Sequence, residues 1–252
     1  MTALLDVEGL SVTFGGLHAV ADLDLTVEEG TLVGLIGPNG AGKTTFIDAL
    51  TGFVPSRGRV TFDGTDITGA RPHQRARRGL GRTWQSLELF DDLTVRENLQ
   101  VAAEGQSLGG VLADFVLPAR RHDQSGVEFA LDAVGLAGLA DRMPGEVSQG
   151  QRKLVGVARA LAARPRLVCM DEPAAGLDST ESRHLGRQLR RLVDGGTTVL
   201  LVDHDMGLVL DVCDRVYVIE YGRRIAEGPP AEIARDPRVI EAYLGTTAEV
   251  RP

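Results

Sequence analysis

Residues 31–44 limit what this chain can fold into more than any other segment. Residues 31–36 (TLVGLI) form a mostly apolar run, which predicts a buried strand. The next eight residues, Gly-Pro-Asn-Gly-Ala-Gly-Lys-Thr at 37–44, match the pattern G-x-x-x-x-G-K-[ST], and a helix is expected from there to about Leu50. A strand, a glycine-rich loop and a helix in this order predict a loop that binds phosphate groups.

Each residue type in this loop suits the binding of phosphate. Glycines let backbone N–H groups turn inward around phosphate oxygens, and the helix N-terminus adds a partial positive charge. Lys43, one of two lysines in the chain, would place a cation on the β- and γ-phosphates of ATP, and the Thr44 hydroxyl would reach Mg²⁺. The alternative is a tight strand–helix turn on the surface. The predicted nucleotide contacts here are Gly37, Asn39, Gly40, Ala41, Gly42, Lys43, Thr44 and Thr45.

A second apolar run, at residues 167–170, ends in two acidic residues, Asp171 and Glu172. A carboxylate at the C-terminal end of a strand lies beside the phosphate loop in sheets of this kind. We therefore expect Asp171 to hold Mg²⁺, directly or through water. Glu172 would orient and deprotonate the attacking water. The alternative is a solvated strand end without a catalytic role.

Apolar strands alternate with helical segments along much of the chain. We expect strands at 58–62, 167–170, 197–202 and 216–219, and helices at 43–50, 180–193 and 206–212. Residues 1–30 alternate apolar and polar side chains, which predicts short strands, whereas residues 86–158 lack strand signals and are expected to be mostly helical. This pattern is typical of one α/β domain with a largely parallel sheet and a helical insertion.

The composition narrows the classes of function. The 252 residues include 27 basic and 35 acidic side chains, a net charge of −8. A nucleic-acid-binding domain usually carries a basic surface, so no nucleic-acid partner is expected. No stretch approaches the roughly 18 apolar residues that cross a bilayer, and the first ten residues do not resemble a signal peptide. Cys169 and Cys213 are expected to be reduced thiols.

Residues 71–82 contain five arginines and His73. This basic cluster could contact a partner or lipid headgroups. The simpler interpretation, which we favour, is the solvated face of a helix predicted at residues 72–79, because such clusters are common on protein surfaces.

The motifs resemble those of the nucleotide-binding subunits of ATP-binding-cassette (ABC) transporters. The segment Val147-Ser148-Gln149-Gly150-Gln151 and the helical RKLVGVARAL that follows it resemble the family's signature loop, 20 residues before Asp171. Val147 replaces the usual leucine and Gln149 replaces the first glycine of S-G-G-Q. Ser148 and Gly150, whose small groups approach phosphate, are retained.

The resemblance covers essentially the whole chain and implies its architecture. It implies an α/β fold with a phosphate-loop NTPase (RecA-like) core, an antiparallel β subdomain and an inserted helical subdomain. Residues 1–252 would form a single nucleotide-binding domain. Its core would span about 1–85 and 159–227, its helical insertion about 86–158, and its C-terminal helical tail about 228–252.

The resemblance also assigns roles to residues around the nucleotide. Phe14 lies where the family has an aromatic that stacks on adenine, although a phenylalanine is often a core strand residue. Gln85, within Arg82-Thr83-Trp84-Gln85, matches the glutamine that touches Mg²⁺ and water, although it could be an ordinary exposed side chain. His204, after an apolar strand, matches the switch histidine that contacts the γ-phosphate.

Further residues would act across a dimer. Ala175-Gly176-Leu177-Asp178 matches the loop that crosses the interface, with Asp178 as its carboxylate. Ser148, Gly150 and Gln151 would bind the ATP held by the opposite subunit, because hydrogen-bond donors at the start of a helix form an anion site. The resemblance thus implies a head-to-tail dimer with an identical or paralogous ATPase, closed by ATP and released by hydrolysis.

The more specific resemblance is to the ATP-binding proteins of branched-chain amino acid uptake. It rests on residues 82–99 (RTWQSLELFDDLTVRENL), 171–177 (DEPAAGL), 204–215 (HDMGLVLDVCDR), 225–228 (IAEG) and 239–245 (VIEAYLG). It implies an ATPase that energises a membrane importer at the cytoplasmic face, with permease subunits and, through them, a solute-binding protein. The permease and the binding protein choose the solute, so branched-chain amino acids and related small polar solutes remain open.

Three other functions are alternatives. An ATPase of lipid or lipopolysaccharide export would have a similar sequence. A non-transport ABC ATPase acting on DNA or ribosomes typically carries coiled coils, zinc modules or a second cassette, which this sequence lacks. A nucleotide-sensing module without catalysis would not need Glu172 and His204.

Overall fold

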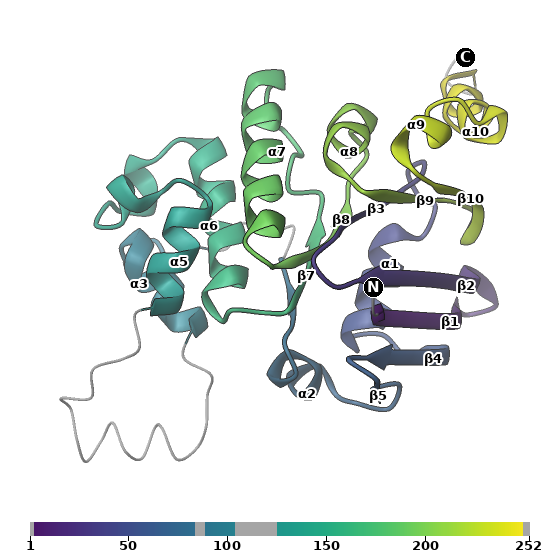
Figure 1. Cartoon of the computed structure of the whole chain (residues 1–252), viewed down its shortest axis with the longest axis horizontal. Coiled ribbons are helices and arrows are strands. Elements are labelled where there is room, and N and C mark those ends of the chain that lie inside the picture. Colours follow the sequence, from purple (N-terminus) through teal and green to yellow (C-terminus); the bar gives the residue numbers. More distant parts are fainter. Residues whose placement is uncertain (1–2, 84–88, 104–124, 249–252) are drawn as a thin grey trace. The chain divides into compact units, whose positions relative to one another are not determined.

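The apolar run before the glycine-rich loop forms strand β3 (Leu32–Ile36; Figure 1). All five of its residues are buried. The computed structural model describes residues 3–83, 89–103 and 125–248. It divides into two units, one of residues 1–85 with 166–252 and the other of residues 86–165. The phosphate loop belongs to the first unit.

The first unit contains a six-stranded sheet in the order β10-β9-β3-β8-β7-β6. Its neighbouring strands are parallel, except that β10 runs antiparallel to β9. Its other strands are β6 (Leu80–Arg82), β7 (Leu167–Asp171), β8 (Thr198–Val202), β9 (Arg215–Glu220) and β10 (Arg223–Gly228). Val202 pairs with Leu35 on one side and with Asp171 on the other. The carboxyl ends of β3, β7 and β8 therefore meet at one edge of the sheet, where the phosphate loop begins.

The same unit contains a second sheet, which is antiparallel and has the strand order β2-β1-β4-β5. Its strands are β1 (Ala3–Phe14), β2 (Leu17–Glu28), β4 (Arg57–Phe62) and β5 (Thr65–Asp66). Alternate residues of β1 and β2, such as Leu10 and Leu23, are buried in one core with Phe46, Leu50 and Leu200. The short strands expected over residues 1–30 are two 12-residue strands, interrupted by irregularities in their pairing. The α/β prediction with an antiparallel β part is confirmed.

Helices connect and cover the strands of this unit. They are α1 (Lys43–Thr51), α2 (Pro72–Arg77), α7 (Ser179–Asp194), α8 (Met206–Val212), α9 (Pro230–Ile233) and α10 (Pro237–Ala248). Helix α7 is amphipathic, because Leu185, Leu189 and Leu192 are buried on one face while its arginines lie mostly outward. No helix among the described residues is both long and apolar enough to cross a membrane.

Among the described residues of the second unit there are helices, turns and loops but no strand. It contains α3 (Val95–Ala103), α5 (Ser125–Ala133), α6 (Gln149–Ala162) and two short 3₁₀ turns at Ala137–Leu139 and Pro144–Glu146. Thr94 and Glu97 form the capping box that their spacing predicts, since the Thr94 N–H donates to Glu97 Oε2 at 2.8 Å. Helices α3 and α5 both pack on α6.

The interpretation of the basic cluster as a solvated helix face is wrong for two of its arginines. Arg75 is buried, and its guanidinium donates to the carbonyls of Ala49 and Leu50 in the last turn of α1, as well as to Ala70 and Thr68. The Arg82 side chain is only 8% exposed and bonds to Asp48 Oδ1 at 2.5 Å. A helix end leaves carbonyls without partners inside the helix, and the Arg75 guanidinium satisfies two of them.

Candidate functional site

The predicted phosphate loop lines a cavity of about 330 Å³ beside β3 and α1. Residues 39–45 and Glu172 contribute to its wall, together with Leu17, His18, Ala19 and Tyr221. Gly42, just before α1, has a φ of 100°, and a Cβ there would lie 2.2 Å from the Ala19 carbonyl oxygen. The loop therefore needs glycine at this position to keep its shape against β2.

Lys43 is buried at the start of α1, and its ammonium group lies on the loop itself. Its Nζ donates to the Gly37 carbonyl at 2.8 Å and to the Pro38 carbonyl at 3.0 Å. Burial lowers the pKa of Lys43, while Glu172, Asp171 and Asp203 oppose that shift. An ammonium has three donors, so two carbonyl bonds leave one hydrogen for a phosphate oxygen. The loop carbonyls thus hold Lys43 where an anion can reach it.

Asp171 ends β7 beside the first turn of α1. Thr44 Oγ1 donates to Asp171 Oδ1 at 3.5 Å, so the two side chains predicted to hold Mg²⁺ do lie together. Asp171 Oδ2 is buried, accepts no hydrogen bond from the described residues and lies 3.7 Å from Arg82 Nη2. Burial raises the pKa of this carboxyl, and Arg82 opposes the shift. A hydroxyl and a carboxylate with a free buried oxygen fit Mg²⁺, which takes few protein ligands and keeps several waters.

Arg82 and Asp48 lie beside Asp171, and no role in the site was predicted from the sequence for either residue. The Arg82 guanidinium joins Asp48 of α1 to Asp171 of β7. An arginine in a basic run is ordinarily assigned to the surface, and its partners here are 34 and 89 positions away along the chain. The sequence signal that could have indicated a role for Arg82 is its place in the same Arg82-Thr83-Trp84-Gln85 segment as the predicted Gln85.

Glu172 follows Asp171 with a left-handed backbone, at a φ of 49°. Its N–H donates to the Val202 carbonyl at 2.7 Å, which ties the turn to the end of β8. Non-glycine residues seldom adopt this conformation unless neighbouring structure imposes it, and such residues gather at functional sites. The turn places the Glu172 side chain on the wall of the cavity, beside the phosphate loop.

His204 lies just beyond β8, and its ring is 54% exposed. Nδ1 is 3.7 Å from Glu172 Oε2 and 3.6 Å from Asp203 Oδ1. The structure therefore brings together the predicted general base and the predicted switch histidine. His204 itself is not part of the cavity wall.

Asp203 is a residue that our sequence reasoning missed. Its side chain is fully buried and accepts hydrogen bonds from the backbone N–H groups of Ala174 at 3.2 Å and Asp205 at 3.0 Å. Burial raises its pKa, and these hydrogen bonds oppose the shift. Asp203 thus joins the loop after Glu172 to the loop that carries His204. The rule used for Asp171, a carboxylate directly after an apolar strand, would have found it.

Phe14 is the last residue of β1 and pairs with Leu17 across the hairpin. Its side chain is 50% exposed, which excludes the alternative that it is a core residue. Phe14 is not among the residues of the cavity wall, whereas its partner Leu17 is. The β1–β2 hairpin therefore places an exposed aromatic next to the cavity.

The predicted dimer residues begin two helices. Ser148 is the N-cap of α6, where it exchanges hydrogen bonds with Gln151 in a capping box, and Gly150 lies in the first turn. Asp178 is the N-cap of α7 and accepts from the N–H groups of Thr180 and Glu181, and these bonds lower its pKa. Ser148 and Asp178 thus each cap a helix, which is a structural role within the chain. Gln85 lies outside the described residues.

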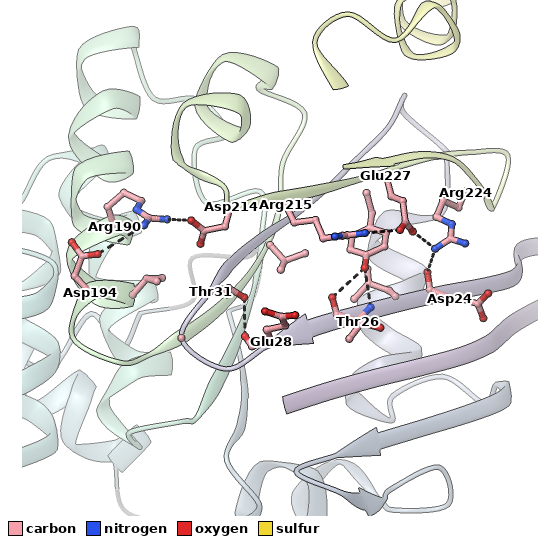
Figure 2. Close-up of a pocket in the computed structure, with 15 residues that line it drawn as sticks. Asp24, Thr26, Glu28, Thr31, Arg190, Asp194, Asp214, Arg215, Arg224 and Glu227 are labelled. Carbon is pink, nitrogen blue, oxygen red and sulfur yellow. Dashed lines mark hydrogen bonds and ion pairs between the residues drawn. The ribbon is translucent and has the colours of Figure 1, made fainter. Parts of the chain in front are cut away.

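A larger cavity, of about 710 Å³, lies at the other end of the strands, where β3 and β9 begin (Figure 2). Its charged residues are largely paired with one another: Arg190 with Asp214 and Asp194, and Arg215 and Arg224 both with Glu227. Tyr217 donates to the Thr26 carbonyl at its floor. Of these contacts, the one between Tyr217 and Thr26 joins the two sheets. No residue of the phosphate loop lines this cavity, so it does not belong to the predicted site.

Comparison with known proteins agrees with this geometry. The family model described as "ABC transporter" matches residues 20–175, and that described as "Branched-chain amino acid ATP-binding cassette transporter" matches residues 223–249. The high-affinity branched-chain amino acid transport ATP-binding proteins BraF of Pseudomonas aeruginosa and LivG of Escherichia coli are 43% and 39% identical to the chain, with 96% of it and 98% of each relative covered. The lipopolysaccharide export ATP-binding protein LptB of E. coli is 37% identical, with the same coverage.

Solved structures give the same result. An ATP-binding cassette of an ABC transporter in its ADP conformation superimposes with a TM-score of 0.86 at 33% identity, covering 97% of this chain and all of the other. A nucleotide-free cassette superimposes with a TM-score of 0.84, also at 33% identity, covering 96% of this chain and 99% of the other. The chain therefore belongs to the ABC transporter family, in the group of branched-chain amino acid transport ATP-binding proteins, and is an ATPase.

Proposed function

We propose that this ATPase binds ATP with Mg²⁺ in the cavity beside the phosphate loop. The observation that carries the proposal is the convergence of Lys43, Thr44, Asp171 and Glu172 on one corner of the parallel sheet. Gly37 and residues 39–45 would hold the phosphates, and Phe14 would stack on the adenine. Thr44, Asp171 and Gln85 would hold Mg²⁺, which neutralises phosphate charge when bound.

Glu172 is the proposed general base. Its carboxylate would accept the proton of the water that attacks the γ-phosphate, and His204 would contact the γ-phosphate and keep the carboxylate oriented. The constrained backbone at Glu172 and the 3.7 Å separation of the two side chains support this division of roles. Asp203 would act as a positioning residue, because its hydrogen bonds fix both loops.

We further propose a head-to-tail dimer with a second ATPase subunit, identical or paralogous. Ser148, Gly150 and Gln151 of one subunit would contact the ATP bound by the other, and Asp178 would lie at the interface. Residues 86–158 would act as the helical subdomain inserted into the core, and residues 228–252 as its tail. Donors at the start of α6 support the anion site.

The proposed transport role is the uptake of branched-chain amino acids or related small polar solutes. The ATPase would dock on permease subunits at the cytoplasmic face of the membrane, and a solute-binding protein would deliver the solute to the permease. The match of residues 223–249 and the higher identity to BraF than to LptB favour uptake over lipopolysaccharide export.

Two measurements on the membrane complex test this function. Glu172→Gln should lower phosphate release by at least about 100-fold, since general base catalysis contributes about 10²- to 10⁴-fold, while ATP binding is retained. Undiminished hydrolysis by this variant would refute the role of Glu172. Uptake of labelled leucine into vesicles holding the complex should require wild-type chain and ATP. Leucine uptake that does not depend on the chain would refute the transport role.

A further inference from the structure

The turn between β9 and β10 has an unusual residue at its first position. Glu220 pairs with Arg223, so Tyr221 and Gly222 form a two-residue hairpin loop. Their φ angles are 47° and 77°, and a loop with two left-handed residues favours asparagine or aspartate followed by glycine. A tyrosine fits this backbone poorly, and its side chain is 83% exposed. Neither backbone preference nor burial explains the tyrosine, and such an outlier is a reason to look for a function.

Hydrogen bonds fix this turn to both sides of the nucleotide cavity. The Gly222 N–H donates to the Ala41 carbonyl of the phosphate loop at 2.9 Å. The Gly222 carbonyl accepts from the Ala21 N–H of β2 at 2.8 Å. A Cβ on Gly222 would lie 2.7 Å from the Ala19 carbonyl oxygen, so the turn packs closely on β2. The Tyr221 ring is therefore carried by backbone that is anchored to the phosphate loop.

The cavity itself has room for more than phosphates. Its wall includes residues 39–45 and Glu172, which face the phosphate groups in the proposed function. The remaining wall is formed by Leu17, His18 and Ala19 of β2 and by Tyr221. Leu17 and Ala19 are apolar, and His18 and Tyr221 carry aromatic rings. Apolar and aromatic groups suit a nucleoside.

We propose that the Tyr221 ring is a specificity-determining contact for the nucleoside of the bound nucleotide, packing against it from the β9–β10 turn. Leu17 and His18 bound the same subsite from the β1–β2 hairpin, next to the exposed Phe14. This inference rests on the proposed nucleotide site and adds to it a second aromatic group. Because the turn is tied to Ala41, the backbone that carries the ring keeps a fixed position relative to the phosphate loop.

The test compares Tyr221→Asn with the wild-type chain by titration calorimetry. Asparagine suits the turn, so folding is preserved, and thermal unfolding checks this. Two ligands are used: ATP, and inorganic tripolyphosphate, which has the phosphates without the nucleoside. We expect ATP to bind Tyr221→Asn about five- to twentyfold more weakly than wild type, while tripolyphosphate binds both equally. Tyr221→Phe, which keeps the ring, should bind ATP within about twofold of wild type.

Each contrary result has a definite meaning. Equal ATP affinity in Tyr221→Asn and wild type overturns the inference, as does an equal loss for tripolyphosphate, which would place the effect in the phosphate loop. A loss in Tyr221→Phe as large as in Tyr221→Asn also overturns it. Lys43→Ala is the control for the site as a whole. If wild type and Lys43→Ala bind ATP equally, the proposed nucleotide site fails, whatever Tyr221 does.

Discussion

The His204 imidazole lies 3.7 Å from the Glu172 carboxylate, and the two residues follow neighbouring parallel strands. Glu172 is linked to β8 through the Val202 carbonyl, and Asp203 bonds to the loop after Glu172. The pairing of β7 with β8 and the short loops after them therefore place the two residues side by side.

We expect His204→Ala to slow hydrolysis by about 100-fold while ATP affinity changes by less than about threefold, because the histidine orients reacting groups and does not hold the α- and β-phosphates. Single-turnover phosphate release and equilibrium ATP binding measure the two effects. His184→Ala, which removes an exposed histidine of α7, is the matched control and should have wild-type rates. An equal loss in both variants would count against the role of His204.

Thr44→Ala should weaken the binding of Mg²⁺ at the nucleotide site. The variant removes a hydroxyl that lies 3.5 Å from Asp171 Oδ1, so we expect the Mg²⁺ concentration for half-maximal hydrolysis to rise about tenfold. ATP affinity in excess EDTA should stay within about twofold of wild type. Thr45→Ala, the neighbouring threonine, is the comparison. A Mg²⁺ titration unchanged by Thr44→Ala would contradict the assignment.

Arg75→Ala should destabilise the protein. The change removes a buried guanidinium that satisfies carbonyls of Ala49, Leu50, Ala70 and Thr68, so we expect a loss of about 2–4 kcal/mol in the free energy of unfolding. Arg78→Ala, at the exposed end of α2, should lose less than about 0.5 kcal/mol. Denaturant unfolding measures both, and equal losses would mean that Arg75 has no special role.

Cys169 should make stability depend on alkaline pH. Burial raises the pKa of this thiol to about 12, so the folded state keeps its proton after the unfolded chain, with a pKa near 8.5, has lost it. Stability then falls as pH rises from about 9 towards 12. Between pH 8 and pH 10 the contribution is about 2 kcal/mol, and Cys169→Ala should reduce the decline in unfolding free energy by that amount. Identical pH dependence in the two proteins would contradict it.

The sequence predicted those parts of the fold that local patterns encode. The buried strands β3, β7, β8 and β9 are continuous apolar runs, and the helices α1, α7 and α8 follow from periodicity and capping residues. Three strands were missed for physical reasons. β5 has only two residues and β6 only three, one of them Gly81. β10 is a largely polar edge strand whose sequence, RRIAEG, lacks an apolar pattern.

The site was predictable where its chemistry lies in contiguous motifs. Lys43, Thr44 and Asp171 come from such motifs, and the fold brings them together. Arg82 and Tyr221 were not predicted, because their surroundings depend on long-range pairing. A charge run does not reveal that one arginine reaches Asp48, and a Tyr-Gly turn does not reveal that its backbone bonds to Ala41. Such contacts follow from tertiary structure and leave little trace in a local pattern.

The two ends of α1 are held in different ways, and this has a mechanical consequence. Its first residue, Lys43, is bound to the phosphate loop, and the carbonyls of its last turn are bound by Arg75. A helix restrained at both ends does not fray, so its nine residues act as a stiff rod about 13 Å long. A movement of the phosphate loop on nucleotide binding would therefore be transmitted along α1 to α2, which carries Arg75.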